Sequence, residues 1–323
     1  MQAKQRLQKE PVLTIILKTD KMPKRKREAM STLNLTLLTD LYEITMMQGY
    51  FKTNNREVVI FDMFYRSNPC NGGYAVCAGL QQVIDYIKNL HFSTEDIDYL
   101  RSLRMFDEDF LDYLHAFRFS GDIYAIPEGS VIFPREPLLK VIAPIMEAQL
   151  IETAVLNMIN HQSLIATKAA RVCYAAKGDG VMEFGLRRAQ GPDSGVYGAR
   201  AAMIGGCRGT SNVLAGSLFD VPVLGTHAHS WIMSFPDEYT AFQKYAAMYP
   251  SACILLVDTY DTLQSGIPNA IRVFSEMRAK GIPLTYYGIR MDSGDLAYLS
   301  KKARRMLDEA GFTDAVISAS NDL

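Results

Sequence analysis

The chain has 323 residues, a formal net charge of −1 and 48% hydrophobic residues. These values are typical of a globular protein with one large or two ordinary domains and a substantial core. The small net charge gives no support for a surface that binds nucleic acid or membrane. No apolar run approaches the roughly 18 residues that are needed to cross a bilayer. The five scattered cysteines form no CxxC pair, which favours reduced thiols in a cytoplasmic protein over a disulfide framework or zinc site.

The first 29 residues differ in composition from the rest. Residues 1–29 contain nine Lys and Arg against three acidic residues. We expect this segment to be a disordered basic extension, with a targeting tail as the alternative.

Residues 30–147 are expected to form an N-terminal mixed α/β domain with sandwich-like packing. Strand-like segments occur at 57–65 and 74–80. The segment 93–96 has the pattern of a cap that begins a short helix. Short extended runs broken by prolines follow between 123 and 142, which indicates sheet edges and turns.

Residues 148–176 contain neither Pro nor Gly, and they are expected to form one long helix that bridges two domains. Beyond them, strands and capped helices alternate about every 30 residues, which predicts parallel βαβ units. The expected strands are 181–184, 221–225, 252–257, 284–289 and 315–318. Because no G-x-G-x-x-G turn follows any strand, a barrel is favoured over an open sheet. Residues 148–323 are therefore expected to form an irregular parallel α/β barrel domain that is incomplete at its C-terminal end.

Polar residues gather where these strands end. The five groups are Glu183 to Arg188, Thr226 to Ser230, Asp258 to Asp261, Arg290 to Asp295, and Asn321-Asp322. In a parallel barrel these strand ends meet at one rim, where the βα loops build the active site. The arrangement therefore predicts an enzyme.

Three of these groups have side chains with distinctive chemistry. The two histidines at 227 and 229 suit a metal site, a nucleophilic or acid–base histidine, or simple packing at a strand end. Arg187 and Arg188 beside Phe184 suit an anionic planar ligand, with a surface ion pair as the alternative. The run Arg290–Asp295 suits ribose hydroxyls, phosphate or magnesium pyrophosphate, with a helix cap as the alternative.

Six ordered motifs together resemble the nicotinate phosphoribosyltransferase family, over residues 35–323. They are TDLY (39–42), EFGLRRAQG (183–191), RGTSNVLAG (208–216), GTHAHS (225–230), DTYDT (258–262) and RMDSGD (290–295). The resemblance implies an N-terminal α/β domain, an irregular α/β barrel and a homodimer with shared active sites. It also implies that nicotinate, phosphoribosyl pyrophosphate and ATP are converted to nicotinate mononucleotide, pyrophosphate, ADP and phosphate. This reaction of NAD biosynthesis would require Mg²⁺, whose protein ligands stay unassigned.

The resemblance also implies residue roles. His229 corresponds to the histidine that the family phosphorylates with ATP. Phe184 and Tyr42, the latter from the neighbouring subunit, would enclose the pyridine ring, and Arg187 would face its carboxylate. The roles that remain are nicotinate binding by Ser211, Thr226 and Arg290, and binding of phosphoribosyl pyrophosphate or its ribose by Arg290, Asp292, Ser293, Asp295 and Asn321.

Ser211 bears on the choice of substrate. Nicotinamide-specific relatives have an aspartate at this position, so a neutral serine favours the acid over the amide. A nicotinamide-specific enzyme and a catalytically inactive fragment are the alternatives. The family's Gly-rich loop for the 5′-phosphate would lie beyond Leu323, so the resemblance implies a C-terminally truncated chain.

Overall fold

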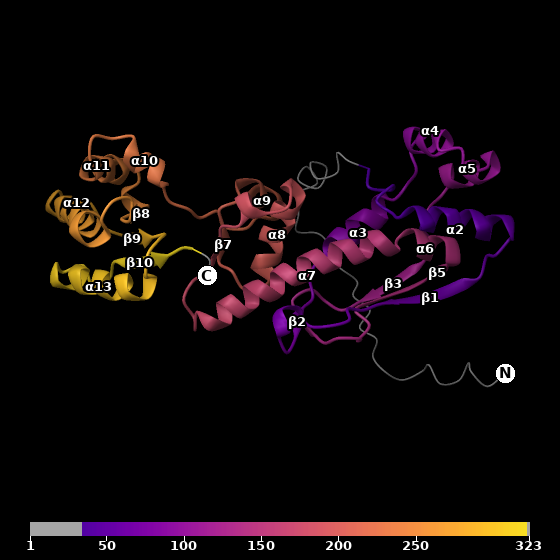
Figure 1. Ribbon diagram of the computed structural model, residues 1–323, viewed down its shortest axis with the longest axis horizontal. Coiled ribbons are helices and arrows are strands. Elements are labelled where there is room, and N and C mark those ends of the chain that lie inside the picture. The colour runs from indigo at the N-terminus through magenta and orange to yellow at the C-terminus, as the bar shows by residue number, and fades with distance from the viewer. Residues whose placement is uncertain (1–33, 322–323) are drawn as a thin grey trace. The chain divides into compact units, whose positions relative to one another are not determined.

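The computed structural model of the protein describes residues 34–321, which divide into two compact units (Figure 1). The first unit ends at Leu224 and the second begins at Gly225. Each unit has its own core of buried apolar side chains, so each is described by itself. The expected α/β class is confirmed. The basic segment 1–29 lies outside the described residues.

The first unit combines helices with short strands. Its helices are α2 (Leu41–Lys52), α3 (Leu80–Asn89), α4 (Thr94–Ser102), α5 (Glu108–His115), α6 (Ile145–Leu150), α7 (Glu152–Ala175), α8 (Pro192–Ile204) and α9 (Val213–Phe219), with 3₁₀ turns η1 (Pro69–Asn71) and η2 (Leu186–Arg188). Its strands are β1 (Val58–Met63), β2 (Ala75–Val76), β3 (Asp122–Ala125), β4 (Val131–Ile132), β5 (Leu139–Pro144), β6 (Met182–Glu183) and β7 (Gly209–Thr210). The helices α2, α3 and α5 were not expected from the sequence.

Strands β1, β5 and β3 form an antiparallel sheet in that order. Val58 lies opposite Pro144, and Asp122 lies opposite Ile142. Alternate residues of β5 are buried, as expected for a sheet with one face toward the core. Helices α2 and α6 pack together beside this sheet (Figure 1). The strands expected between 57 and 142 are therefore present, although that at 74–80 is only two residues long.

Helix α7 is the long helix that was expected, but it begins at Glu152 after a break at Ile151. It packs against β2, α3 and α8, which all belong to the first unit. The expected domain boundary between residues 147 and 148 therefore lies inside this unit. Close contact with α8 depends on Gly205, since a Cβ atom there would lie 2.4 Å from the carbonyl oxygen of Ala166.

The second unit has a parallel sheet in the order β10-β9-β8. Its strands are β8 (Cys253–Leu256), β9 (Tyr287–Met291) and β10 (Val316–Ala319). Its helices are α10 (His229–Met233), α11 (Glu238–Met248), α12 (Ile267–Ala279) and α13 (Leu296–Glu309), with a 3₁₀ turn η3 (Pro250–Ala252) and a π-helical turn η4 (Thr262–Gly266). These three strands and the helices α11, α12 and α13 match the predicted alternation.

The predicted strand at 221–225 is wrong. Within this segment only Val223 makes an isolated parallel bridge, to Thr210. The strand that pairs with β6 is instead β7, whose Gly209 and Thr210 lie opposite Met182 and Glu183. The apolar residues at 221–224 suggested a buried strand, but Val223 and Leu224 are exposed. The described parallel strands thus form two separate sheets, of two strands in the first unit and three in the second.

Candidate active site

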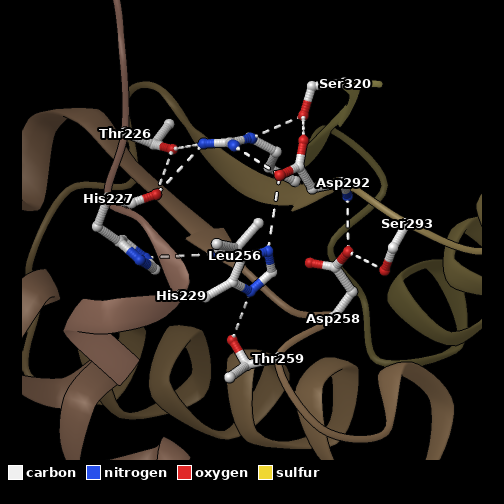
Figure 2. Close-up of polar contacts among 10 residues, drawn as sticks. Thr226, His227, His229, Leu256, Asp258, Thr259, Asp292, Ser293 and Ser320 are labelled. Atoms are coloured by element: carbon white, nitrogen blue, oxygen red, sulfur yellow. Dashed lines mark hydrogen bonds and ion pairs between the residues drawn. The ribbon is translucent and has the colours of Figure 1, made fainter. Parts of the chain in front are cut away.

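His229 lies at the centre of a polar cluster in the second unit (Figure 2). It is the first residue of α10, and its ring lies between Thr259 and Asp292, which follow β8 and β9 in the chain. Its Nδ1 lies 3.1 Å from the hydroxyl of Thr259, and its Nε2 lies 3.6 Å from a carboxylate oxygen of Asp292. The side chain is 39% exposed. An oriented and accessible imidazole of this kind can transfer a proton or accept a phosphoryl group.

Arg290, in β9, is the cation of this cluster, and its side chain is only 11% exposed. Its guanidinium donates to the hydroxyl of Thr226 at 2.7 Å and to the hydroxyl of Ser320 at 2.9 Å. It also lies 3.4 Å from the carboxylate of Asp292. Contacts on several sides hold the planar guanidinium in one orientation, so its charge is preorganised for an anionic ligand.

Asp292 connects His229 with Arg290. Burial raises the pKa of its carboxyl, but a hydrogen bond from Ser320 and the charge of Arg290 outweigh burial, and the pKa lies below its usual value. The hydroxyl of Ser320 donates to the other carboxylate oxygen at 2.6 Å. Asp292 is therefore a carboxylate at neutral pH, able to accept hydrogen bonds from ligand hydroxyls.

Asp258 fixes the turn that carries Asp292. One of its carboxylate oxygens accepts from the backbone N–H of Asp292 at 2.8 Å and from the hydroxyl of Ser293 at 2.6 Å (Figure 2). The other oxygen is buried with no hydrogen-bond partner among the described residues. A buried carboxylate that accepts from a turn in this way restrains both the backbone and the serine. Ser293 is thus a part of the turn rather than a free hydroxyl.

The other two predicted site residues of this unit, Asp295 and Asn321, are exposed. The carboxylate of Asp295 caps α13 by accepting from the N–H of Tyr298 at 2.9 Å. This is the structural alternative that the sequence left open, and it uses one of the two oxygens. Asn321 is exposed in the bend after β10.

In the first unit, the parallel pair β6–β7 brings two predicted residues together. Ser211 follows β7, and its N–H donates to the carbonyl of Glu183 at 3.0 Å, next to Phe184. The Glu183 carboxylate accepts from the hydroxyl of Thr210 at 2.6 Å and from the N–H of Gly185. Phe184 and Ser211 therefore directly follow the ends of two paired strands. The hydrogen bonds of the Glu183 carboxylate stabilise both strand ends.

Arg187 and Tyr42 also belong to the first unit. Arg187 lies in the exposed turn η2, three residues after Phe184. Tyr42 is 45% exposed, and its hydroxyl donates to Glu152 at 3.2 Å. Tyr42 lines a cavity of about 640 Å³, together with apolar and amide side chains of α7 such as Leu156 and Asn157.

Three contributors to the cluster were not assigned as site residues from the sequence. They are Ser320, Thr259 and Asp258. Each follows the end of a parallel strand, which is the signal that could have identified them. Asp258 and Thr259 belong to the DTYDT motif, whereas Ser320 lies in no motif.

Two negative findings apply to residues 34–321. They contain no group of three or more His, Cys, Asp or Glu side chains arranged to hold a metal ion. They also contain no helix that is both long and apolar enough to span a membrane.

Two family models match the sequence and together cover most of the chain. The nicotinate phosphoribosyltransferase N-terminal domain matches residues 37–160, and the nicotinate phosphoribosyltransferase family model matches residues 180–314. Among curated relatives, the nicotinate phosphoribosyltransferase of Bacillus subtilis is 52% identical over 291 residues, which is 90% of this chain and 59% of that protein. The Dictyostelium discoideum nicotinate phosphoribosyltransferase is 40% identical, over 94% of this chain and 60% of that protein. The chain thus spans about three fifths of the length of these curated relatives.

Solved structures agree with the sequence comparisons. Human nicotinic acid phosphoribosyltransferase is similar with a TM-score of 0.80 and 33% identity, over 88% of this chain and 68% of that one. The nicotinate-nucleotide pyrophosphorylase of Pyrococcus furiosus is similar with a TM-score of 0.71 and 25% identity, over 94% of this chain and 68% of that one. By its sequence and by its fold, the chain belongs to the nicotinate phosphoribosyltransferase family.

Proposed function

We propose that the protein transfers a phosphoribosyl group to nicotinate in NAD biosynthesis. Nicotinate, phosphoribosyl pyrophosphate and ATP would give nicotinate mononucleotide, pyrophosphate, ADP and phosphate. The observation that carries this proposal is the accessible ring of His229 between Thr259 and Asp292, beside the restrained cation Arg290. Membership of the family gives the substrates that this geometry would serve.

In this proposal the γ-phosphoryl group of ATP passes to the imidazole of His229, releasing ADP. Water later hydrolyses the phosphohistidine to free histidine and phosphate. Thr259 on one ring nitrogen and Asp292 near the other would orient the imidazole, because each has a polar atom facing a ring nitrogen.

Phosphoribosyl transfer would proceed by attack of the pyridine nitrogen on C1 of the ribose. The C1–O bond to pyrophosphate breaks as the new C–N bond forms, through an oxocarbenium-like state. Asp292 would hold ribose hydroxyls, and Arg290 would stabilise the negative charge that develops on pyrophosphate. Ser293, Asp295 and Asn321 are proposed to help bind phosphoribosyl pyrophosphate or its ribose at the same end of the sheet. Mg²⁺ would enter bound to the pyrophosphate group as a part of the substrate.

Residues of the first unit are proposed to bind nicotinate: Phe184 would stack on the pyridine ring, and Arg187 would pair with its carboxylate. Thr226 and Arg290 of the second unit are also proposed as nicotinate-binding residues. Ser211 leaves the strand end next to Phe184, where it would face the ring substituent without adding a negative charge. Tyr42 of a partner subunit would cover the ring in a homodimer.

We propose the cytoplasm as the compartment of the protein, which agrees with its five free cysteines.

The test measures nicotinate mononucleotide formation and nicotinate-stimulated ATP hydrolysis by the purified protein. His229→Ala should lower ATP hydrolysis by at least about 100-fold, because it removes the phosphoryl acceptor itself. His115→Ala is the matched control, since His115 is an exposed histidine of α5, and it should keep the parent rate. Failure of the parent to form nicotinate mononucleotide would overturn the proposed function. Unchanged ATP hydrolysis in His229→Ala would overturn the phosphohistidine.

A further inference from the structure

The imidazole of His227 lies in the interior of the second unit, two residues before His229. The residue is 8% exposed, and its ring packs edge-on against Tyr245 with centroids 4.5 Å apart. Burial, together with the charges of Arg290 and His229, lowers the pKa of His227 to about 4. The ring is therefore neutral near pH 7, with a proton on one nitrogen and a lone pair on the other. Its Nε2 accepts a hydrogen bond, whereas its Nδ1 is buried with no hydrogen-bond partner among the described residues.

The accepting nitrogen meets the outer edge of β8. The N–H groups of Cys253 and Val257 point toward β9. They donate to the carbonyl of Tyr286, the residue before β9, at 2.9 Å and to the carbonyl of Arg290 in β9 at 3.0 Å. Successive N–H groups of a strand point to opposite edges, so the N–H of Leu256 points away from β9. It donates to Nε2 of His227 at 3.3 Å (Figure 2).

This hydrogen bond has two chemical consequences. A nitrogen that accepts an N–H has no proton, so the proton of the neutral ring is on Nδ1. Its lone pair is also engaged, so this nitrogen is not free to bind a metal ion. The structure therefore disfavours a metal site shared by the two histidines, which was one of the interpretations that the sequence allowed. His227 takes the place of a neighbouring strand at the edge of β8.

The backbone of the same residue supports the cluster. The guanidinium of Arg290 donates to the carbonyl of His227 at 3.3 Å, besides its bond to Thr226. His229 begins α10 directly after Ala228. The two rings point in different directions, that of His227 toward Leu256 and that of His229 toward Thr259 and Asp292 (Figure 2).

We propose that His227 is a positioning residue: by accepting the N–H of Leu256, its side chain ties residues 226–229 to β8 and thereby sets the positions of Arg290 and His229. The part of this proposal that concerns catalysis rests on the proposed function. The part that concerns the hydrogen bond stands without it. If His227 only packed against its apolar neighbours, its side chain would not need to accept a hydrogen bond. The positioning role requires that acceptor.

The test compares His227→Gln with His227→Leu. The glutamine amide oxygen reaches about as far as Nε2 and can accept the same N–H, whereas leucine fills the space and accepts nothing. Hydrogen exchange of single backbone amides is measured on both variants and on the parent. In His227→Leu the Leu256 amide should exchange at least about tenfold faster, because it has lost its acceptor. The Val257 amide, bonded to β9, is the internal control and should not change.

Kinetics with nicotinate and phosphoribosyl pyrophosphate give the second measurement. His227→Leu should lower kcat/KM by at least about tenfold, and His227→Gln should stay within about threefold of the parent. Should the leucine variant not fold, His227→Asn replaces it, since its shorter amide corresponds in reach to Nδ1 and leaves Leu256 without an acceptor.

The outcomes separate the two proposals. Equal exchange of the Leu256 amide in all variants would overturn the positioning role, as would equal impairment of the glutamine and leucine variants. A parent without transferase activity would overturn the proposed function, while the exchange contrast would still decide whether His227 holds β8.

Discussion

At the scale of single residues, a few hydrogen bonds hold the charged groups of the second unit. Arg290 and Asp292 are both restrained by Ser320, and Asp258 restrains the turn of Asp292. None of these bonds is unusual by itself. Together they hold the guanidinium and the carboxylate in fixed orientations before a ligand arrives, as the proposed stabilisation of a leaving pyrophosphate would require.

Ser211 gives a prediction about the choice between acid and amide. Nicotinate and nicotinamide have nearly the same shape, so charge rather than size must separate them. Ser211→Asp places a negative charge at the strand end next to Phe184. It should weaken nicotinate use by at least about tenfold, which corresponds to about 1.4 kcal/mol. Nicotinamide use should fall less, or rise.

The measurement is the ratio of kcat/KM for the two substrates. Ser211→Asn is the matched control, because it has nearly the size of aspartate without its charge, and it should change the ratio much less. If the aspartate and asparagine variants changed the ratio equally, the charge of residue 211 would not face the ring substituent.

At the scale of secondary structure elements, a sequence pattern predicted the structure well where it specified particular hydrogen bonds, as a helix cap does. The Ser93–Asp96 pattern predicted a capped helix, and α4 begins there. The hydroxyl of Ser93 accepts from the N–H of Asp96 at 3.1 Å, and the Asp96 carboxylate accepts from the N–H of Ser93 at 2.8 Å. By contrast, the apolar run at 221–225 predicted a strand that the structure lacks, because hydrophobicity alone does not specify a partner strand.

The cap of α4 gives a prediction about stability. Ser93→Ala removes the hydroxyl that satisfies a free N–H of the first turn, so the free energy of unfolding of the first unit should fall by about 1 kcal/mol. Ser102→Ala, near the exposed C-terminal end of the same helix, should change it by less than about 0.5 kcal/mol. Urea unfolding followed by circular dichroism measures both. A loss that was equal in the two variants would show that the cap has no special contribution.

At the scale of the whole molecule, the two compact units have separate cores. Phe110 is fully buried in the first core and Phe274 in the second. The single tryptophan, Trp231, belongs to α10 of the second unit and packs against Phe235 with centroids 4.7 Å apart. Its fluorescence therefore reports on the second unit.

We predict that the two units unfold separately. Phe274→Ala should lower the urea midpoint that is detected by tryptophan fluorescence, since a buried Phe→Ala change costs about 3–5 kcal/mol. Phe110→Ala should leave that midpoint unchanged and lower the stability that is detected by circular dichroism. If both variants shifted the fluorescence transition by the same amount, the two units would be one cooperative structure.

The fold class, most of the elements in the second unit and the family could be predicted from the amino-acid sequence. Strand–helix alternation from residue 252 onward is local and periodic, so hydrophobic spacing and caps suffice to predict it. The six motifs are contiguous, and contiguous residues need no tertiary information to be read. They indicated the family that the comparisons then established.

Which polar groups contact one another could not be predicted without the three-dimensional fold. Ser320 and Thr226 lie 94 residues apart in sequence, yet both contact the guanidinium of Arg290. Residue chemistry alone also left the two histidines at 227 and 229 equivalent, and only the resemblance to the family singled out His229. The structure distinguishes them. The N–H of Leu256, at the edge of β8 away from β9, donates to the ring of His227, whereas the ring of His229 contacts Thr259 in the polar cluster. This difference in packing depends on the pairing of strands that are distant in sequence.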